Sequence, residues 1–334
     1  MAAFTEVAAL PCSPEKAEVY ACASDDANAQ ARSLQGWSQL YDQISPGSFH
    51  GAIEGICTDS LHVFREVTNA RLRQSCVVKS DAWWFGIPVR EDVSFRLDAR
   101  MIPWGEIAIR RGHQVFELMT PASFEIFGIV VERKKLEEHL RLFHDVAPPD
   151  DHDDLLRAAP HARTRLRTLL HELLSQTLLY PEVAQSVNAR EAMEQSLMDA
   201  VADACRERSA SYEVSKAERQ QASLVRDVRE YLLSLDDRVA SVPELCRNFN
   251  ISRRTLQYAF EQVLGMGPNA YLKLLRLNGV RRDLGRRRAL NKSVQQVAAD
   301  WGFWHLSQFS KDYKQHFLEL PSLTLKRTQD ARPR

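Results

Sequence analysis

The pattern of hydrophobic and polar positions changes twice along the chain of 334 residues. Residues 37–132 contain short β-branched and aromatic runs separated by Gly, Pro and Asp, such as HVFREV, WWFGIPV, VFEL and FEIFGIVV. Runs of this kind predict many short strands, and we expect a β-rich sandwich-like or barrel-like domain over residues 37–145. Residues 1–36 are Ala-rich and polar, which predicts a flexible N-terminal tail.

A helical period replaces the strand pattern after residue 145. The segment 146–156, VAPPDDHDDLL, reads as an acidic linker. Two apolar stripes at helical spacing follow it, Leu166, Leu169, Leu170, Leu173 and Leu174 and then Met193, Leu197, Val201 and Cys205. Pro181 lies between them. Residues 146–215 are therefore predicted to hold the linker and a helical hairpin, which either packs on the β-rich domain or forms a dimer interface.

Two segments in the last third repeat one another. They are SVPELCRNFNISRRTLQYAFEQVLGMGP (241–268) and SVQQVAADWGFWHLSQFSKDYKQHFLELP (293–321). Each begins with an S-x-x-E/Q capping box, which predicts the start of a helix. Asn250 and Gly302 come where the chain must turn sharply, and both residue types tolerate positive φ. Each segment is thus predicted to form a helix, a tight turn and a longer second helix.

The second helix of each unit has an apolar face and a polar face. Leu256 and Phe260 align with Phe309 and Tyr313 as core positions. The positions around them are polar or aromatic: Arg253, Arg254, Gln257, Tyr258, His305, Ser307, Gln308 and Lys311. Arg matches guanine O6/N7 and Gln matches adenine N6/N7, and a recognition helix presents such side chains to the major groove. A helical bundle without a ligand is the alternative, and it leaves the polar face unexplained.

The segment between the units, NAYLKLLRLNGVRRDLGRRRAL, predicts a connecting helix with a basic end. Its arginines are Arg281, Arg282, Arg286, Arg287 and Arg288. They form either a solvated helix end or a phosphate-contacting cluster beside the two recognition helices. A rigid connector would hold those helices one DNA turn apart, roughly 34 Å.

Charge is distributed unevenly although the whole chain has a formal net charge of zero. Residues 221–334 contain 20 Lys and Arg against 11 Asp and Glu, a net charge of +9, so the remainder carries −9. A basic C-terminal third favours contact with a polyanion, although clustering on solvated helix faces gives the same count.

Residues 221–328 resemble the DNA-binding domain of the AraC/XylS family of transcriptional regulators. The resemblance rests on VQQVAADWGFWHLSQFSKDYKQHF and the Pro that follows, with Leu318 where the family usually has glycine. It implies an all-α domain of two helix-turn-helix units joined by a linker helix, hence an α+β protein overall. It also implies RNA polymerase as a partner and base contacts from Arg254, Gln257, Tyr258, Ser307, Gln308 and Lys311, and we add His305 as a phosphate contact.

From about Trp37 onward the chain resembles family members that activate genes of ethanolamine catabolism. The stretches include YDQISPGSFHG, FREVTNARLRQSC and WGFWHLSQF. This resemblance implies ethanolamine and adenosylcobalamin as effectors; a family regulator with another effector and operon is the alternative. An ammonium ligand favours aromatic faces or carboxylates, for which Glu66, Trp83, Trp84, Phe85 and Glu117 are candidates, with core or surface positions as the plainer interpretation. The D-x-H-x-x-G pattern of base-off cobalamin proteins is missing, since DDHDDL at 150–155 ends in Leu.

Other classes of function find little support in the sequence. His50, His62 and His113 form no H-x-H or H-x-x-x-H pair within residues 37–132, so we expect no enzyme, no metal site and no catalytic cofactor. The six cysteines are scattered without a C-x-x-C pair, which predicts free thiols. No apolar run approaches the ~18 residues of a membrane span and no secretory signal is evident, so we expect a cytoplasmic protein.

Overall fold

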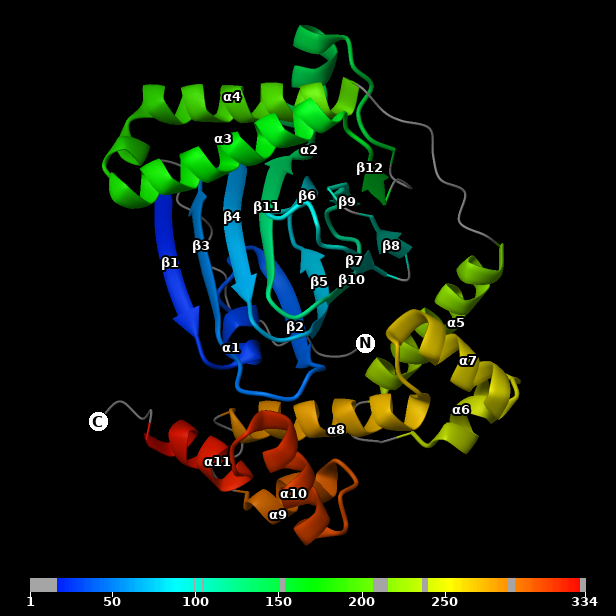
Figure 1. The fold of residues 1–334 in the computed structure, drawn as a ribbon. Helices are drawn as coiled ribbons and strands as arrows, with labels where there is room; N and C mark the ends of the chain where they lie inside the picture. Colours follow the sequence, from blue (N-terminus) through cyan, green and yellow to red (C-terminus); the bar gives the residue numbers. More distant parts are fainter. Residues whose placement is uncertain are drawn as a thin grey trace.

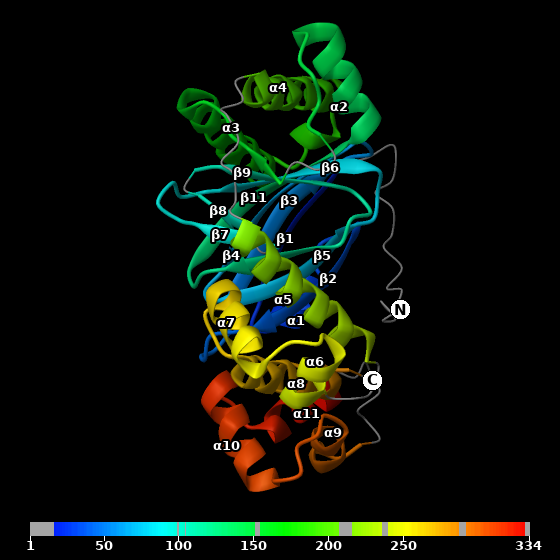
Figure 2. The same cartoon turned by 90° about the vertical axis from the view of Figure 1, so that its right-hand side faces the viewer.

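The computed structural model describes residues 17–98, 100–103, 105–150, 154–206, 216–235, 240–286 and 292–330. Figure 1 shows an N-terminal half (17–206) of antiparallel sheets and helices above a C-terminal half (216–330) of helices alone. The turned view in Figure 2 shows the same order of layers. The predicted α+β class is confirmed.

Within the described residues, the strands form two antiparallel sheets. The larger sheet has the order β1 (Glu18–Ser24), β3 (Gly51–Cys57), β4 (Leu61–Thr68), β11 (Phe124–Glu132), β6 (Ala82–Pro88), β9 (Ile107–Arg111) and β12 (Leu155–Leu156). The smaller sheet has the order β2 (Trp37–Gln43), β5 (Leu72–Val78), β10 (Phe116–Thr120), β7 (Phe95–Leu97) and β8 (Arg100–Ile102). The predicted sandwich of short strands is therefore present.

The larger sheet is apolar on both faces because both are covered. Alternate residues of a strand point to opposite faces. On β6, Trp83 and Phe85 belong to the core under the helices, whereas Trp84 belongs to the core between the sheets. This two-sided burial explains why WWFGIPV reads as a continuous apolar run rather than an alternating one.

The helical hairpin packs on the larger sheet. It consists of α3 (Pro160–Leu179) and α4 (Val187–Arg206), joined through the short turn η2 (Val183–Gln185). Leu166, Leu170 and Leu197 share one core with Val63 and Ile129 of the sheet, and Figure 1 shows both helices lying across the strands. Of the two interpretations offered by the sequence, packing on the β-rich domain is confirmed. The helix α2 (Arg133–His139) continues into a π-helical turn, η1 (Leu140–His144), at one end of this layer.

The C-terminal half contains seven helices within the described residues. They are α5 (Lys216–Ser234), α6 (Val242–Asn248), α7 (Arg253–Leu264), α8 (Pro268–Leu284), α9 (Val294–Asp300), α10 (Leu306–Phe317) and α11 (Pro321–Asp330). In Figure 1, α8 runs beneath the strands, with α6 and α7 at one end and α9 to α11 below the other. None of the helices in the described ranges has the length and hydropathy needed to cross a bilayer.

Two expectations need correction. The predicted tail (1–36) extends too far, because β1 pairs with β3 and α1 (Ala27–Ala31) packs beside β2; residues 1–16 lie outside the described ranges. The free-thiol prediction holds for Cys22, Cys76, Cys205 and Cys246 but is wrong for Cys57, which is disulfide-bonded. Sequence spacing does not reveal which cysteines the fold brings together.

Candidate nucleic-acid interface

The first repeat folds as α6, a tight turn and α7. Ser241 caps α6 by accepting a hydrogen bond from the Glu244 N–H, and the Glu244 carboxylate accepts one from the Tyr231 hydroxyl at 2.9 Å. Asn250 has φ of 48° in the turn. Ser252 then caps α7 by accepting from the Thr255 N–H. The predicted helix–turn–helix and its positive-φ residue are confirmed.

The second repeat has the same construction with one more residue in the turn. Ser293 and Gln296 form a reciprocal capping box at the start of α9. Gly302 has φ of 75° in the turn, and α10 begins at Leu306. Four residues separate α6 from α7 and five separate α9 from α10, so the inserted residue falls where the alignment predicted it.

Each unit has its own apolar core. Leu256 and Phe260 of α7 are fully buried in one cluster, and Phe309 and Tyr313 of α10 are equally buried in another. The aligned core positions are therefore confirmed. Because each second helix is anchored through this face, its opposite face remains available to a ligand.

The polar residues predicted for that opposite face are largely at the surface. Arg253, Arg254, Tyr258, His305, Ser307, Gln308 and Lys311 are exposed, and Gln257 is half-buried. The Gln257 amide donates to Glu261 at 2.5 Å, and the Gln308 amide donates to Asp312 at 3.0 Å. These i,i+4 contacts hold both amides along the surfaces of their helices.

The helix α8 joins the units and contributes to both cores. Its Tyr271 and Leu272 pack with the first unit, while Leu277 and Val280 pack with the second. A helix of 17 residues is about 25 Å long, and the one-turn spacing of the recognition helices stays a prediction. Each unit is thereby fixed to an opposite end of a rigid rod.

The basic cluster does not form one phosphate-facing surface. Arg281 is buried, with its guanidinium bonded to Asp26 at 2.7 Å and Glu319 at 2.5 Å. Arg282 pairs with the fully buried Asp42. The phosphate-contact prediction for Arg281 is therefore wrong. Arg281 lies one helical turn after Leu277 and Asn278, on the buried face of α8, so its side chain meets carboxylates of the fold. Arg286 is exposed, whereas Arg287 and Arg288 lie outside the described residues.

The sequence of this region has known relatives. Residues 245–327 match the family model of a helix-turn-helix domain. The chain is 35% identical over 103 residues to a probable thc operon regulatory protein of Rhodococcus erythropolis, which covers 31% of each chain. It is 33% identical over 82 residues to the regulatory protein HrpB of Ralstonia nicotianae, covering 25% of this chain and 17% of that one.

A third relative is the XylDLEGF operon transcriptional activator of Pseudomonas putida, 35% identical over 86 residues and covering 26% of this chain and 27% of that one. The chain thus spans about a third or less of the length of these relatives. Among solved structures, the AraC-like transcriptional activator CuxR is 15% identical, with a TM-score of 0.39 over 78% of this chain and 94% of that one. ToxT from Vibrio cholerae O395 is 12% identical, with a TM-score of 0.28 over 87% and 97%.

The helix-turn-helix domain is joined to the N-terminal half by a polar junction. The side chain of Asn278 on α8 accepts from the Gln43 N–H and donates to the Gln43 carbonyl, both at 2.9 Å. His316 of α10 contacts the same carbonyl at 3.0 Å, and its own carbonyl accepts from the Gly47 N–H at 2.9 Å. Arg71 donates to the Leu264 carbonyl at the end of α7, where a helix dipole favours a cation.

Buried charges continue across this junction. Arg73 of β5 is fully buried and pairs with Asp42 at 2.7 Å as well as with Glu117. Arg229 of α5 lies against the same Glu117 from the other half. Burial, together with the nearby Arg73, lowers the pKa of Arg229 to about 10. The arginines Arg73 and Arg282 hold the pKa of Asp42 below its usual value although burial opposes this.

The five predicted effector residues do not share one site. Trp83 and Phe85 lie in the core under α3 and α4, whereas Trp84 stacks on Phe116 between the sheets, 4.8 Å between ring centroids. Glu117 belongs to the junction. Strand alternation separates the neighbours in WWF, since consecutive side chains point to opposite faces.

Glu66 is the predicted effector residue with the most unusual surroundings. Its buried carboxylate accepts hydrogen bonds from the Gln30 amide at 2.8 Å, the Tyr41 hydroxyl at 2.9 Å and the Gln74 amide at 3.4 Å. Within the described residues it forms no ion pair with Lys, Arg or His. Burial raises the pKa of Glu66, while the three hydrogen bonds act against that rise.

A polar cleft of about 510 Å³ opens at the boundary between the halves. Its walls come from Asp98, Arg110, Gln114, Val115, Asp154, Arg226 and Glu230. None of the five predicted effector residues lines it. The sequence offered no signal for this cleft, because its residues come from loops, from the strand β9 and from α5.

Trp304 is a surface feature that the sequence-based list omitted. It is 86% exposed, two residues before the start of α10, and its ring lies 4.8 Å from that of His305. The neighbouring Trp301 packs inward instead, so the string WGFWH contains one structural and one surface indole. The indole of Trp304 therefore lies at the surface beside the exposed polar face of α10.

Proposed function

We propose that this protein is a sequence-specific DNA-binding transcriptional activator of the AraC/XylS type whose N-terminal half senses a small molecule. The observation that carries the proposal is the pair of helix-turn-helix units, each with its own core and an exposed polar second helix, fixed to one connecting helix. The match of residues 245–327 to a helix-turn-helix domain supports it, as do relatives named as operon regulators and activators.

Both recognition helices carry side chains suited to base edges. Arg254 matches the O6 and N7 acceptors of guanine, and Gln257 and Gln308 match adenine. Ser307 and Lys311 lie on the same exposed side of α10. We assign His305, Trp304 and the arginines that follow α8 to contacts with the DNA backbone. The positive charge of the arginines contributes affinity there without sequence preference.

The effector that we propose is ethanolamine, bound at Glu66. A carboxylate that is buried without a cation is an unfavourable arrangement, and an ammonium group would compensate it. The buried Gln30 Oε1 and Thr68 Oγ1 atoms, which have no hydrogen-bond partner among the described residues, would suit the ammonium or hydroxyl of such a ligand. Thr68 follows Glu66 by two residues on β4, so both side chains are on the same face.

Adenosylcobalamin is proposed as the second effector on the sequence resemblance alone. The described residues do not fit it well: the cleft at the boundary is lined mainly by charged side chains, and the D-x-H-x-x-G pattern is missing. We therefore derive no step through this group.

Coupling between the halves would pass through the junction. The strands β2 and β5 supply Asp42, Gln43 and Arg73, while Tyr41 and Gln74 of the same strands bond Glu66. A ligand at Glu66 thus acts on strands that also hold α8. It would shift the balance between docked and released helix-turn-helix domains by its differential affinity for the two states.

Two protein partners complete the proposal. RNA polymerase is expected because an activator must contact it or recruit it. A second copy of the chain is proposed at the turn of the hairpin, where Leu179, Tyr180, Val183 and Val187 are more than half exposed. Such apolar residues grouped at one end of a hairpin favour a protein contact.

The test is binding of the full-length protein to DNA upstream of its neighbouring operon, compared with random DNA of equal length at ~150 mM salt. Four arms contain no effector, ethanolamine, adenosylcobalamin, or both. We expect specific binding, with an affinity or footprint that changes with effector. Equal affinity for random DNA would overturn the proposed function, and specific binding indifferent to both compounds would reject the effectors while retaining the DNA-binding role.

A further inference from the structure

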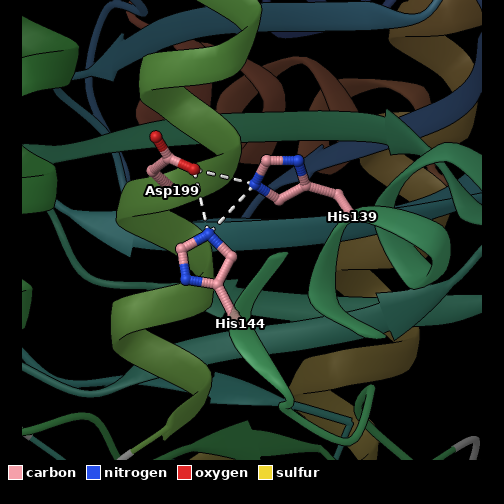
Figure 3. Close-up of side chains that lie close together, drawn as sticks. All are labelled: His139, His144 and Asp199. Carbon is pink, nitrogen blue, oxygen red and sulfur yellow. Dashed lines mark hydrogen bonds and ion pairs between the residues drawn. The ribbon is translucent and has the colours of Figure 1, made fainter. Parts of the chain in front are cut away.

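Two histidines and an aspartate converge between the end of α2 and helix α4 (Figure 3). The Nε2 atoms of His139 and His144 lie 2.8 and 2.9 Å from Asp199 Oδ1 and 3.2 Å from each other. His139 is buried, and the other two side chains are partly exposed at 15% and 37%. The cluster is outside both the helix-turn-helix domain and the Glu66 environment.

We propose that His139, His144 and Asp199 bind a divalent transition-metal ion of the zinc class. Two imidazole nitrogens and one carboxylate oxygen are ligands that Zn²⁺ accepts readily, and three protein ligands leave a position for water. Bonds of about 2.0–2.1 Å in a tetrahedral site place ligand atoms about 3.3 Å apart. The triangle formed by these three atoms is close to that size, so an ion seated just above its plane reaches all three without a large movement.

The backbone is shaped to bring the two histidines together. His139 and His144 are five residues apart, a spacing that puts side chains on different sides of an α-helix. Here the segment Leu140–His144 is a π-helical turn, which is wider and brings residues five apart closer to one face. Single π turns occur frequently at functional sites. The sequence-based expectation of no metal site considered histidine pairs in residues 37–132 and so did not include this pair.

Hydrogen bonding among the three side chains is the alternative explanation of the cluster. One contact, made by Arg206, distinguishes the hydrogen-bonded state from the metal-bound state. Arg206 Nη2 lies 3.1 Å from His144 Nδ1, to which an arginine can only donate. With Nδ1 accepting, a neutral His144 carries its proton on Nε2 and cannot bind an ion there. A metal-bound neutral imidazole carries the proton on Nδ1 instead, so Arg206 must turn away when metal binds. Its side chain is 51% exposed and has room to do so.

An ion at this place would link two parts of the N-terminal half. His139 and His144 follow β11 of the larger sheet, while Asp199 belongs to α4 of the hairpin. The helix α4 ends at Arg206, after which the chain continues toward α5. Metal binding would therefore fix the last turns of the hairpin to the sheet at the exit toward the helix-turn-helix domain.

The experiment uses full-length protein without a polyhistidine tag, stripped with a chelator and titrated with Zn²⁺ by calorimetry and with Co²⁺ by visible absorption. We expect one ion per chain, a micromolar or tighter dissociation constant, and a Co²⁺ spectrum of low coordination number. His144→Gln and Asp199→Asn are expected to weaken binding at least tenfold. His171→Ala, which removes an exposed histidine of α3, is the matched control and should leave binding unchanged.

Arg206 provides a second, opposite test. Arg206→Gln replaces a donor by a side chain whose amide oxygen accepts from Nδ1–H, so we expect Zn²⁺ to bind more tightly. Circular dichroism of each metal-free variant confirms that it is folded, and His139→Gln replaces any ligand variant that is not. Absence of saturable binding below ~100 µM, or binding that the ligand variants and His171→Ala affect equally, overturns the proposal.

Discussion

At the residue scale, the two recognition helices end in the same left-handed backbone conformation, which glycine adopts in one helix and leucine in the other. Gly265 after α7 has φ of 69°, and Leu318 after α10 has φ of 55°. The left-handed region is unfavourable for L-residues with a Cβ. Leu318 is 64% exposed, so packing explains little of its presence.

Leu318→Gly is therefore expected to stabilise the protein by about 0.5–1 kcal/mol, since the relief of the left-handed strain exceeds the added entropy of the unfolded chain. Gly265→Ala is the reverse substitution at the equivalent position and serves as the control; it is expected to destabilise the protein by about 1 kcal/mol. Denaturant unfolding measures both, and equal effects of the two changes would contradict this account.

Glu66 gives a prediction about pH. Its pKa in the folded state is raised by burial, so its contribution to stability is fully present below the unfolded value of about 4.3 and is lost as pH rises through the folded pKa. Glu66→Gln removes that loss and is expected to raise the melting temperature at pH 7. The difference from the natural protein should shrink toward pH 4; a constant difference across this range would refute the assignment.

The division between base and phosphate contacts is also tested at single residues. Arg254→Ala is expected to cost about 1–3 kcal/mol on the specific DNA and to relax the preference at one base. Arg287→Ala, chosen from the sequence because it lies outside the described residues, should weaken all DNA similarly and lower the salt slope by about one. Binding titrations on specific and random DNA separate these results, and identical behaviour of the two variants would reject the division.

At the scale of elements, one glycine fixes the second unit to the connecting helix. A Cβ on Gly279 would lie 2.4 Å from the ring of Trp301, whose indole N–H donates to Asp283 at 2.7 Å. The indole of Trp301, the C-cap residue of α9, thus lies against α8, and this contact orients the unit. A larger residue in place of glycine would push the unit away from the rod.

Gly279→Ala is accordingly expected to destabilise the second unit by about 1–3 kcal/mol although alanine favours helices. The measurement is denaturant unfolding together with the emission of Trp301. Combining the change with Trp301→Leu should cost less than the sum of the two separate changes, because the clash disappears with the ring. Strict additivity would show that the contact does not orient the unit.

At the scale of the whole molecule, the junction holds the helix-turn-helix domain through buried polar contacts beside a small apolar contact, in which Ile44 and Met119 pack in the core of the first unit. Asn278 and His316 share the Gln43 carbonyl, and Asp42 and Glu117 bind arginines from both halves. Buried pairs of this kind contribute little net stability yet are costly to break singly. The junction is therefore suited to two discrete states.

Asn278→Ala is the sharpest test of this junction. It removes both hydrogen bonds to Gln43 and leaves buried backbone groups without partners, which costs the docked state about 2–3 kcal/mol. We expect effector-free binding to the specific DNA to increase. Asn269→Ala, an exposed asparagine of the same helix, is the control. Unchanged effector dependence in Asn278→Ala would exclude the junction as the route of coupling.

The local features of the C-terminal half were predictable because they depend on neighbours in sequence. The capping serines Ser241 and Ser293, the positive-φ residues Asn250 and Gly302, and the core positions at Leu256 and Phe309 follow from spacing alone. The exposed face of each second helix follows in turn, since a helix anchored on one side presents the other.

Long-range contacts required the tertiary structure. Arg281 and Arg253 look alike in the sequence, but only the fold brings Asp26 and Glu319 to Arg281 and buries it. The aromatic run WWF could not reveal that its side chains divide between two cores. His139, His144 and Asp199 meet because a π turn and a helix 55 residues further along lie side by side. Sequence by itself determined the helix caps, turns and amphipathic faces, because these depend on residues close together in the chain. Only the stacking of the layers decided which distant charges pair, which polar groups are buried and which metal ligands converge.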